Sequence, residues 1–148
     1  MLTILLLISA VIGHAQIIVS ELQPFRLGRW TIGSGDIAAN QDICVALRPQ
    51  GPYSITAGGD SQNGDFVLVS GFDAIAYQLY FNDRPRVNGR TQLVPGEALT
   101  GLRGRRLRRN QPCNRLTANL SIIISETNLT AAPSGRYSSN IVLVVSPE

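Results

Sequence analysis

The sequence of 148 residues contains no lysine, and its only histidine, His14, and only methionine, Met1, lie within the first 15 residues. Without a histidine beyond residue 14, the rest of the chain cannot form a Ser-His or Cys-His catalytic relay. Without lysine it cannot form a Schiff base or supply the lysine of a phosphate-binding loop. Two cysteines are too few for a four-cysteine zinc site. These absences leave a binding or structural module that needs no cofactor, or an enzyme that uses carboxylates alone.

Charged residues are also scarce, at 16%, and aromatic residues make up only 6%, whereas 44% of the residues are hydrophobic. The low charge argues against a disordered chain, and the length suits one domain with its own core. Nothing places two carboxylates together, so a carboxylate-only hydrolase is a remote alternative. Trp30 and Tyr80 could line a sugar site, but aromatic residues of this kind more often belong to a core or a sheet face.

Residues 2–12 (LTILLLISAVI) form a continuous apolar run. A membrane-spanning helix needs about 20 such residues, so this run is too short to span. Gly13-His14-Ala15 follows, a small-x-small pattern that is typical of a signal peptidase site. We therefore predict a signal peptide over residues 1–15, a domain over residues 16–148, and an exported protein without a transmembrane segment. The alternative is a buried first strand of a cytosolic domain.

The two cysteines, Cys44 and Cys113, fit an exported protein. An even count in an oxidising compartment favours a disulfide between them. In the chain-entropy account, closing a loop of this length stabilises the fold by roughly 4 kcal/mol. The alternative is a pair of buried free thiols.

Beyond residue 15 the sequence consists of short strand-like segments separated by turn residues, and no stretch sustains a helical period. Asn63-Gly64-Asp65 predicts a hairpin turn rather than a calcium loop, because its oxygen ligands lack the required spacing. Strict alternation predicts one buried face for residues 116–124 and another for residues 74–81. Such a pattern is typical of an all-β sandwich. The expected strands are 17–22, 42–47, 53–57, 66–70, 74–81, 116–125 and 137–145.

The last of these segments is apolar on both faces near its end, where Val142 and Val144 oppose Ile141, Leu143 and Val145. An exposed strand of this kind would template aggregation through its unpaired backbone groups. We therefore expect it either to lie centrally in a sheet or to be covered by something else.

Several phrases together resemble the spore coat protein U domain, the subunit module of archaic chaperone–usher pili. They are Gly64-Asp65-Phe66-Val67-Leu68, Ala74-Ile75-Ala76-Tyr77-Gln78-Leu79-Tyr80, Asn114-Arg115-Leu116 with the strand after it, and Pro133-Ser134-Gly135-Arg136-Tyr137 with the final strand. The resemblance covers nearly all of residues 16–148. It implies an immunoglobulin-like β-sandwich that lacks its last strand and exposes its core in a groove.

The resemblance also implies how that groove is filled. A periplasmic chaperone inserts a strand first, and a neighbouring pilus subunit then replaces it at the outer-membrane usher, a form of β-augmentation. The protein would act in adhesion and biofilm formation at the cell surface. The alternative is a freestanding secreted binding or coat protein with a complete sandwich. Carried over, the groove residues are Ile141, Leu143, Val145, Phe25 and Leu27.

The sequence departs from the pattern of the family's shaft subunits. It lacks their early cysteine and their long donor extension. It is closer to the pilin-type domain of a tip or minor subunit, which receives a strand without having to donate one. Whether residues 16–20 act as a short donor stays open.

Basic residues concentrate between Arg84 and Arg115, where nine arginines face a single acid, Glu97. Such a run cannot be buried unpaired, so we expect a surface loop or an exposed edge. It is either a solvated loop or a contact for anionic surfaces. No aromatic residue lies in this stretch, which argues against specific nucleic-acid binding. The candidate anion-contact residues are Arg103, Arg105, Arg106, Arg108 and Arg109.

Overall fold

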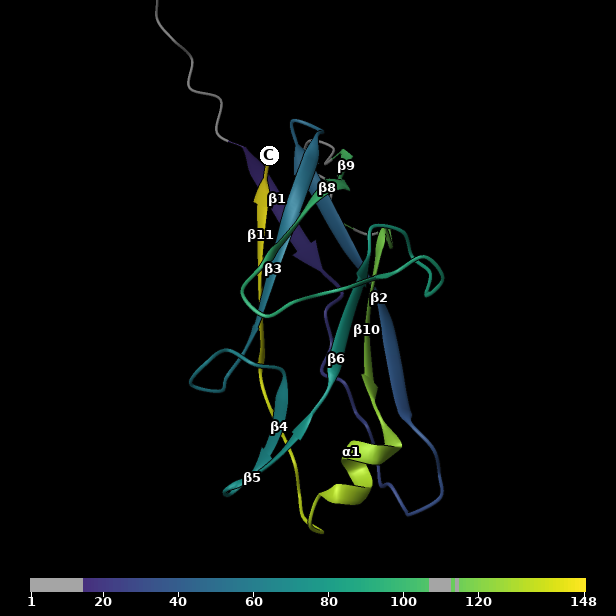
Figure 1. Cartoon of the computed structure of the whole chain (residues 1–148). Coiled ribbons are helices and arrows are strands. Elements are labelled where there is room, and N and C mark those ends of the chain that lie inside the picture. The colour runs from purple at the N-terminus through teal and green to yellow at the C-terminus, as the bar shows by residue number, and fades with distance from the viewer. Residues whose placement is uncertain (1–14, 107–112, 114) are drawn as a thin grey trace, which may run out of the picture.

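The computed structural model describes residues 15–106, 113 and 115–148, and strands dominate it (Figure 1). Most of the predicted signal peptide lies outside these residues, so that prediction stays untested. The one helix of the described residues, α1 (Glu126–Ala131), is short and begins where the side chain of Ser125 accepts a hydrogen bond from the backbone N–H of Asn128. The strands are β1 Gln16–Ser20, β2 Ile37–Arg48, β3 Pro52–Gly59, β4 Val67–Ser70, β5 Asp73–Ala76, β6 Gln78–Asn82, β7 Thr91–Gln92, β8 Ala98–Arg103, β9 Arg105–Arg106, β10 Ala118–Ile124 and β11 Ile141–Pro147.

The strands form two packed sheets and a separate hairpin. One sheet has the order β1-β2-β10-β6-β7, with β9 pairing β2 in parallel, and the other has the order β11-β3-β8. All other pairs are antiparallel, and β4 and β5 form the hairpin at one side (Figure 1). The predicted all-β, immunoglobulin-like sandwich is confirmed.

The core lies between the sheets and follows the alternation of the sequence, since successive strand residues point to opposite faces. The predicted inward face of β10 is buried at Ala118, Leu120, Ile122 and Ile124. The rings of Tyr53 on β3 and Phe81 on β6 pack edge to face with their centroids 6.3 Å apart, which joins the two sheets. Other buried members are Ile43, Val45, Leu47, Ile55, Ala57 and Leu79.

Residues 74–81 do not form the single strand that alternation predicts. The backbone N–H of Tyr77 bonds the carbonyl of Phe66 at 3.0 Å, and there the chain passes from β5, which pairs β4, to β6, which pairs β10. The predicted buried face is nevertheless correct, because Ile75, Tyr77, Leu79 and Phe81 are all buried. A change of sheet keeps the direction of the side chains while changing the hydrogen-bonding partner.

The predicted hairpin at Asn63-Gly64 is wrong, although a turn is present. Gly64 has φ 75° and its carbonyl accepts the N–H of Gly59 at 2.7 Å. A Cβ on Gly59 would overlap the carbonyl of Asp65, so the tight approach requires glycine there. The turn joins β3 to β4, which belong to different sheets and do not pair.

The two late strands are shorter than the sequence predicts. Leu116 is 44% exposed, and beside it the hydroxyl of Thr117 accepts from the N–H of Val45 at 2.8 Å and donates to its carbonyl at 3.1 Å. These side-chain bonds, with one backbone bond from the N–H of Thr117 to the carbonyl of Ile43, interrupt the regular ladder before β10 begins. Similarly, Ser138 bridges to Val69 of the hairpin, and β11 begins only at Ile141.

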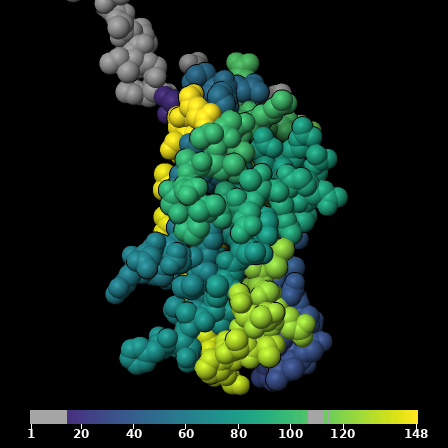
Figure 2. Space-filling model, in the orientation of Figure 1, coloured from purple at the N-terminus to yellow at the C-terminus, as the bar shows by residue number. Residues whose placement is uncertain are grey.

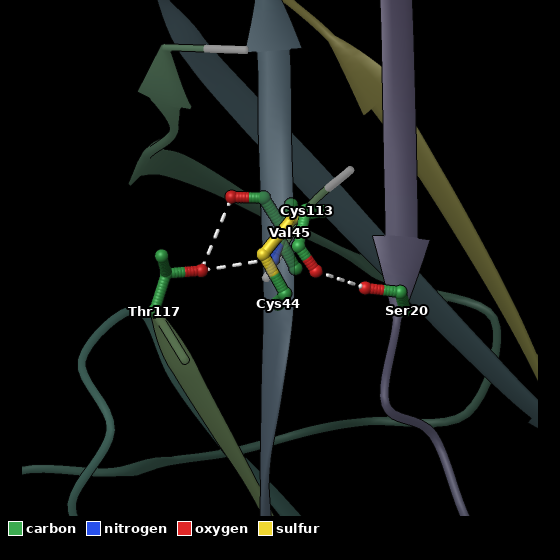
Figure 3. Close-up of a disulfide and its surroundings, with 5 residues drawn as sticks. All are labelled: Ser20, Cys44, Val45, Cys113 and Thr117. Carbon is green, nitrogen blue, oxygen red and sulfur yellow. Dashed lines mark hydrogen bonds between the residues drawn. A yellow bond between two sulfur atoms is a disulfide. The ribbon is translucent and has the colours of Figure 1, made fainter. Parts of the chain in front are cut away.

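The predicted disulfide between Cys44 and Cys113 is confirmed on the outer face of β2 (Figure 3). The hydroxyl of Ser20 donates to the carbonyl of Cys113 at 2.7 Å, so the residue is tied to β1 as well as to β2. The disulfide therefore fixes residue 113 across the first two strands of the larger sheet.

Candidate functional site

The free edge of β11 is the first element of the site. Among the described residues β11 pairs only with β3, in the register Ile141↔Gly59 to Pro147↔Tyr53. The N–H of Glu148 bonds the carbonyl of Pro52 at 3.0 Å, one step beyond that register. Hydrogen-bonded and non-hydrogen-bonded pairs alternate along an antiparallel ladder. The backbone groups of residues 142, 144 and 146 therefore face β3, and those of residues 141, 143 and 145 face the free edge.

β1 lies beside β11 near the end of the chain but does not pair with it (Figure 1). All five residues of β1 pair with β2, from Gln16↔Arg48 to Ser20↔Cys44. β1 therefore belongs to the larger sheet along its whole length.

The chain leaves the sheet after β1 and forms the second wall of the site. Glu21 takes φ 66°, a conformation that is rare for a residue other than glycine. The side chain of Gln41 on β2 then holds Gln23 by both backbone groups, accepting its N–H at 2.8 Å and donating to its carbonyl at 2.7 Å. The side chain of Gln41 thus takes the place of a neighbouring strand for Gln23. It holds the residues that follow, Phe25 and Leu27, against the core.

A groove of about 540 Å³ lies between this wall and the start of β11. Ile141 and Leu143 line one side, and Leu22, Pro24, Phe25 and Leu27 line the other. Leu120 and Ile122 of β10 lie along its floor, which is part of the central core. The groove therefore exposes the interior of the sandwich next to an unpaired strand edge.

A second cavity of about 1020 Å³ continues the groove toward α1. The two share Leu27, Gly28, Leu68 and Tyr137. Trp30, Ile124 and Leu129 line the far part. The indole N–H of Trp30 donates to the carbonyl of Gly35 at 2.8 Å, so this polar group already has a hydrogen-bond partner within the chain. Together the two cavities form a continuous channel that is lined by apolar core side chains and also by polar residues, among them Gln41, Ser139 and Arg136.

All five sequence-predicted groove residues are half-buried and pack against the core. Four of them, Ile141, Leu143, Phe25 and Leu27, line the groove from its two sides, whereas Val145 lies outside its lining. The role of these residues in strand binding stays a prediction. Sequence reasoning missed Gln41, whose contact with a residue 18 positions away leaves no local signal. Leu120 and Ile122 carried a signal, since alternation had placed them on a buried face.

Two titratable groups lie near the start of β11. The carboxylate of Asp60 accepts from the hydroxyl of Ser139 at 2.9 Å and from the N–H of Asn140 at 3.2 Å, and these bonds lower its pKa. Burial raises the pKa of Tyr77, whose hydroxyl has no hydrogen-bond partner among the described residues. Asp60 thereby fixes the two residues that precede the free edge.

The arginines predicted to contact anions that the structure describes, and Tyr80, lie away from the groove. Arg103, Arg105 and Arg106 are exposed on β8 and β9, while Arg108 and Arg109 lie outside the described residues. The guanidinium of Arg90 lies over the ring of Tyr80, 4.5 Å from its centroid, on the larger sheet.

In the part of the chain that the structure describes, no three acidic, histidine or cysteine side chains gather as a metal site. No helix there has the length and apolar character needed to cross a membrane.

No family model and no curated protein matches this chain. Among solved structures, the fold is similar to a chain from a chaperone–tip adhesin complex of CFA/I fimbriae biogenesis, with a TM-score of 0.59 and 15% identity over 89% of this chain. A second similar chain comes from the CsuC–CsuE chaperone–tip adhesion subunit complex of archaic Csu pili of Acinetobacter baumannii, with a TM-score of 0.48 and 19% identity over 89% of this chain. The present chain spans about two fifths of each, 41% and 39%. The first similarity establishes a shared fold: this chain has the sandwich fold found in a chaperone–tip adhesin complex.

Proposed function

We propose that this chain is a structural or adhesive subunit of a chaperone–usher pilus, exported through the periplasm to the cell surface. The observation that carries the proposal is the unpaired edge of β11 beside a groove floored by Leu120 and Ile122 of the core. The fold shared with a chain of a chaperone–tip adhesin complex supports it. The chain needs no cofactor and acts by binding rather than by catalysis.

The physical mechanism is the addition of one strand to the smaller sheet. The N–H and C=O groups of Ile141 and Leu143 face the free edge and would pair with the main chain of the incoming segment. Alternate apolar side chains of that segment would cover the floor of the groove, with each fully buried aliphatic side chain contributing about 1.5–3 kcal/mol. The main chain would supply affinity, and the groove would select side chains by size.

Two occupants would follow one another in this role. A periplasmic chaperone would supply the strand first, and a neighbouring subunit would replace it at the outer-membrane usher. Because β1 is paired along its whole length with β2, this chain fits a subunit that receives a strand, as a tip or minor subunit does.

The experiment appends a linker and one strand of alternating valine and threonine to the C-terminus. In one version the valines face the groove, and in the other the pattern is shifted by one residue, which turns every valine outward. We expect only the first version to raise the free energy of unfolding. It should also slow hydrogen exchange at the amide of Leu143, whereas the amides of Val142 and Val144 are already protected by β3. Equal stability of the two versions would refute the proposal.

The second candidate, a freestanding secreted protein, predicts a different result. Its folding would not depend on another chain, so expression in a bacterial periplasm without any chaperone would yield a stable monomer. The pilus subunit should accumulate only with the chaperone encoded near it, as a complex of the two chains.

A further inference from the structure

The end of the sandwich opposite α1 carries exposed arginines on two strands, β8 and β9 (Figure 1). Gly104 separates Arg103 from Arg105 and Arg106 at the point where the chain crosses from the smaller to the larger sheet. A Cβ at Gly104 would overlap the buried side chain of Leu47 and crowd the backbone carbonyl of Gly51, so any larger residue would have to shift the crossing. The close packing fixes the backbone of the three arginines while their side chains remain in solvent.

A second element of this end is the loop that follows β6. The side chain of Asn82 is only 6% exposed and donates to the carbonyls of Arg86 and Asn88 at 2.8 and 2.9 Å. Its oxygen accepts the N–H of Arg84 at 3.1 Å. The buried side chain of Asn82 thus fixes the backbone of this loop by three hydrogen bonds. The side chains of Arg84 and Arg86 are exposed on the surface of the loop.

The two elements are joined, and the acids beside them bind main-chain groups. Asp83, which precedes Arg84, accepts the N–H of Arg103 at 2.9 Å. Glu148 accepts the N–H of Gly101 at 3.0 and 3.2 Å. Both carboxylates therefore serve to fix the backbone of β8 and of its neighbouring loop.

We propose that Arg84, Arg86, Arg103, Arg105 and Arg106, the arginine face, bind a polyanionic saccharide that carries repeated carboxylate or sulfate groups. Guanidinium groups pair with such anions in a planar, two-bonded geometry that an ammonium group lacks. A single exposed ion pair contributes little, so five charges on a fixed backbone suit a polymer better than one small anion. Nucleic acid is disfavoured because no aromatic residue between Arg84 and Arg115 offers a base a stacking partner.

The test uses fluorescent heparin as the probe, with the full chain and nothing added to its groove. We expect binding that weakens as salt rises, and at least a tenfold loss of affinity on Arg105→Glu/Arg106→Glu, since the charge reversal removes several ionic contacts. The matched control, Arg26→Glu/Arg136→Glu, makes the same change in net charge away from this end and should stay within about twofold.

The control variant distinguishes a specific contribution of the arginine face to heparin binding from a general effect of the protein's net charge. Equal losses in both variants, or no loss in either, would overturn the proposal. A single-stranded oligonucleotide that binds as tightly as heparin, with the same dependence on Arg105 and Arg106, would overturn it in favour of nucleic acid. The experiment does not involve the groove, so its outcome is independent of the pilus proposal.

Discussion

The substitution Leu143→Ala tests whether the groove accepts a strand or whether β11 is simply a half-buried edge strand. In the chain alone, Leu143 is half-buried, with its side chain packed on the core and lining the groove. A strand inserted beside β11 would cover it completely. The same substitution should therefore cost more stability once the groove is filled than while it is empty.

The magnitude follows from the burial. Leucine-to-alanine changes at fully buried sites cost about 2–5 kcal/mol, and half that burial corresponds to roughly 1–2.5 kcal/mol. Taking about 3 kcal/mol for the filled groove and about 1.5 kcal/mol for the empty one, Leu143→Ala should cost about 1.5 kcal/mol more in the filled groove. That difference corresponds to about tenfold weaker binding of the inserted strand.

The assay is urea unfolding of the chain with and without the appended strand. Val144→Ala is the matched control, because Val144 is the next residue along β11 and is 54% exposed on the outer face. It should change the free energy of unfolding by less than about 0.5 kcal/mol in both forms. If Leu143→Ala costs the same in both forms, the inserted strand does not cover Leu143, and the reasoning from the free edge fails.

Three further predictions concern the frame around the groove. Replacing Cys44 and Cys113 by serine opens a loop with a sequence separation of 69 and should lower the free energy of unfolding by about 4 kcal/mol, measured in urea without reductant. Gly104→Ala should cost about 1–3 kcal/mol by overpacking, whereas Gly51→Ala, where a Cβ meets nothing within 4 Å, should cost less than about 1 kcal/mol. Asp60→Asn should destabilise the chain at neutral pH, because hydrogen bonds lower the pKa of Asp60 and its stabilisation is present above the unfolded pKa. The gap between wild type and Asp60→Asn should close as the pH falls below about 4, and a pH-independent gap would contradict this account.

Figure 2 shows the polypeptide wrapped into one body from which the hairpin of β4 and β5 projects at one side. Phe72 at the tip of this hairpin is fully exposed. Ile32, which lines the second cavity, is also largely exposed. Single exposed apolar residues are common on protein surfaces and need no partner to explain them. The channel beside β11 differs from them because core residues line it.

Alternation along the sequence determined which side chains face the core. It correctly placed Leu120 and Ile122 inward, and it placed Ile141 and Leu143 on one face of the last strand. Side-chain direction in a strand depends only on local backbone geometry, which the order of apolar and polar residues encodes. The pairing of the two cysteines was also predictable, because only one partner exists for each.

The outer face of β10 shows where the same reasoning failed. Asn119 and Ser121 fall on the polar side of the pattern, yet both are buried and bonded to each other at 2.6 Å. Asn119 also donates to Asn40 and Asp42 on β2, at 3.1 and 2.8 Å. A polar residue can be buried when distant partners satisfy it, and a local pattern cannot reveal those partners.

The sequence by itself determined an all-β chain, its inward faces and its disulfide, because these depend on residue type and on spacing along the chain. Only the tertiary structure decided where strands end and which edge stays unpaired. Thr117 ends one ladder, Tyr77 marks a change of sheet, and Gln41 holds the wall of the groove, each through hydrogen bonds to residues far away in the sequence. The groove forms where several segments that are distant in the sequence come together, so its position follows from long-range hydrogen bonding and not from any one of them.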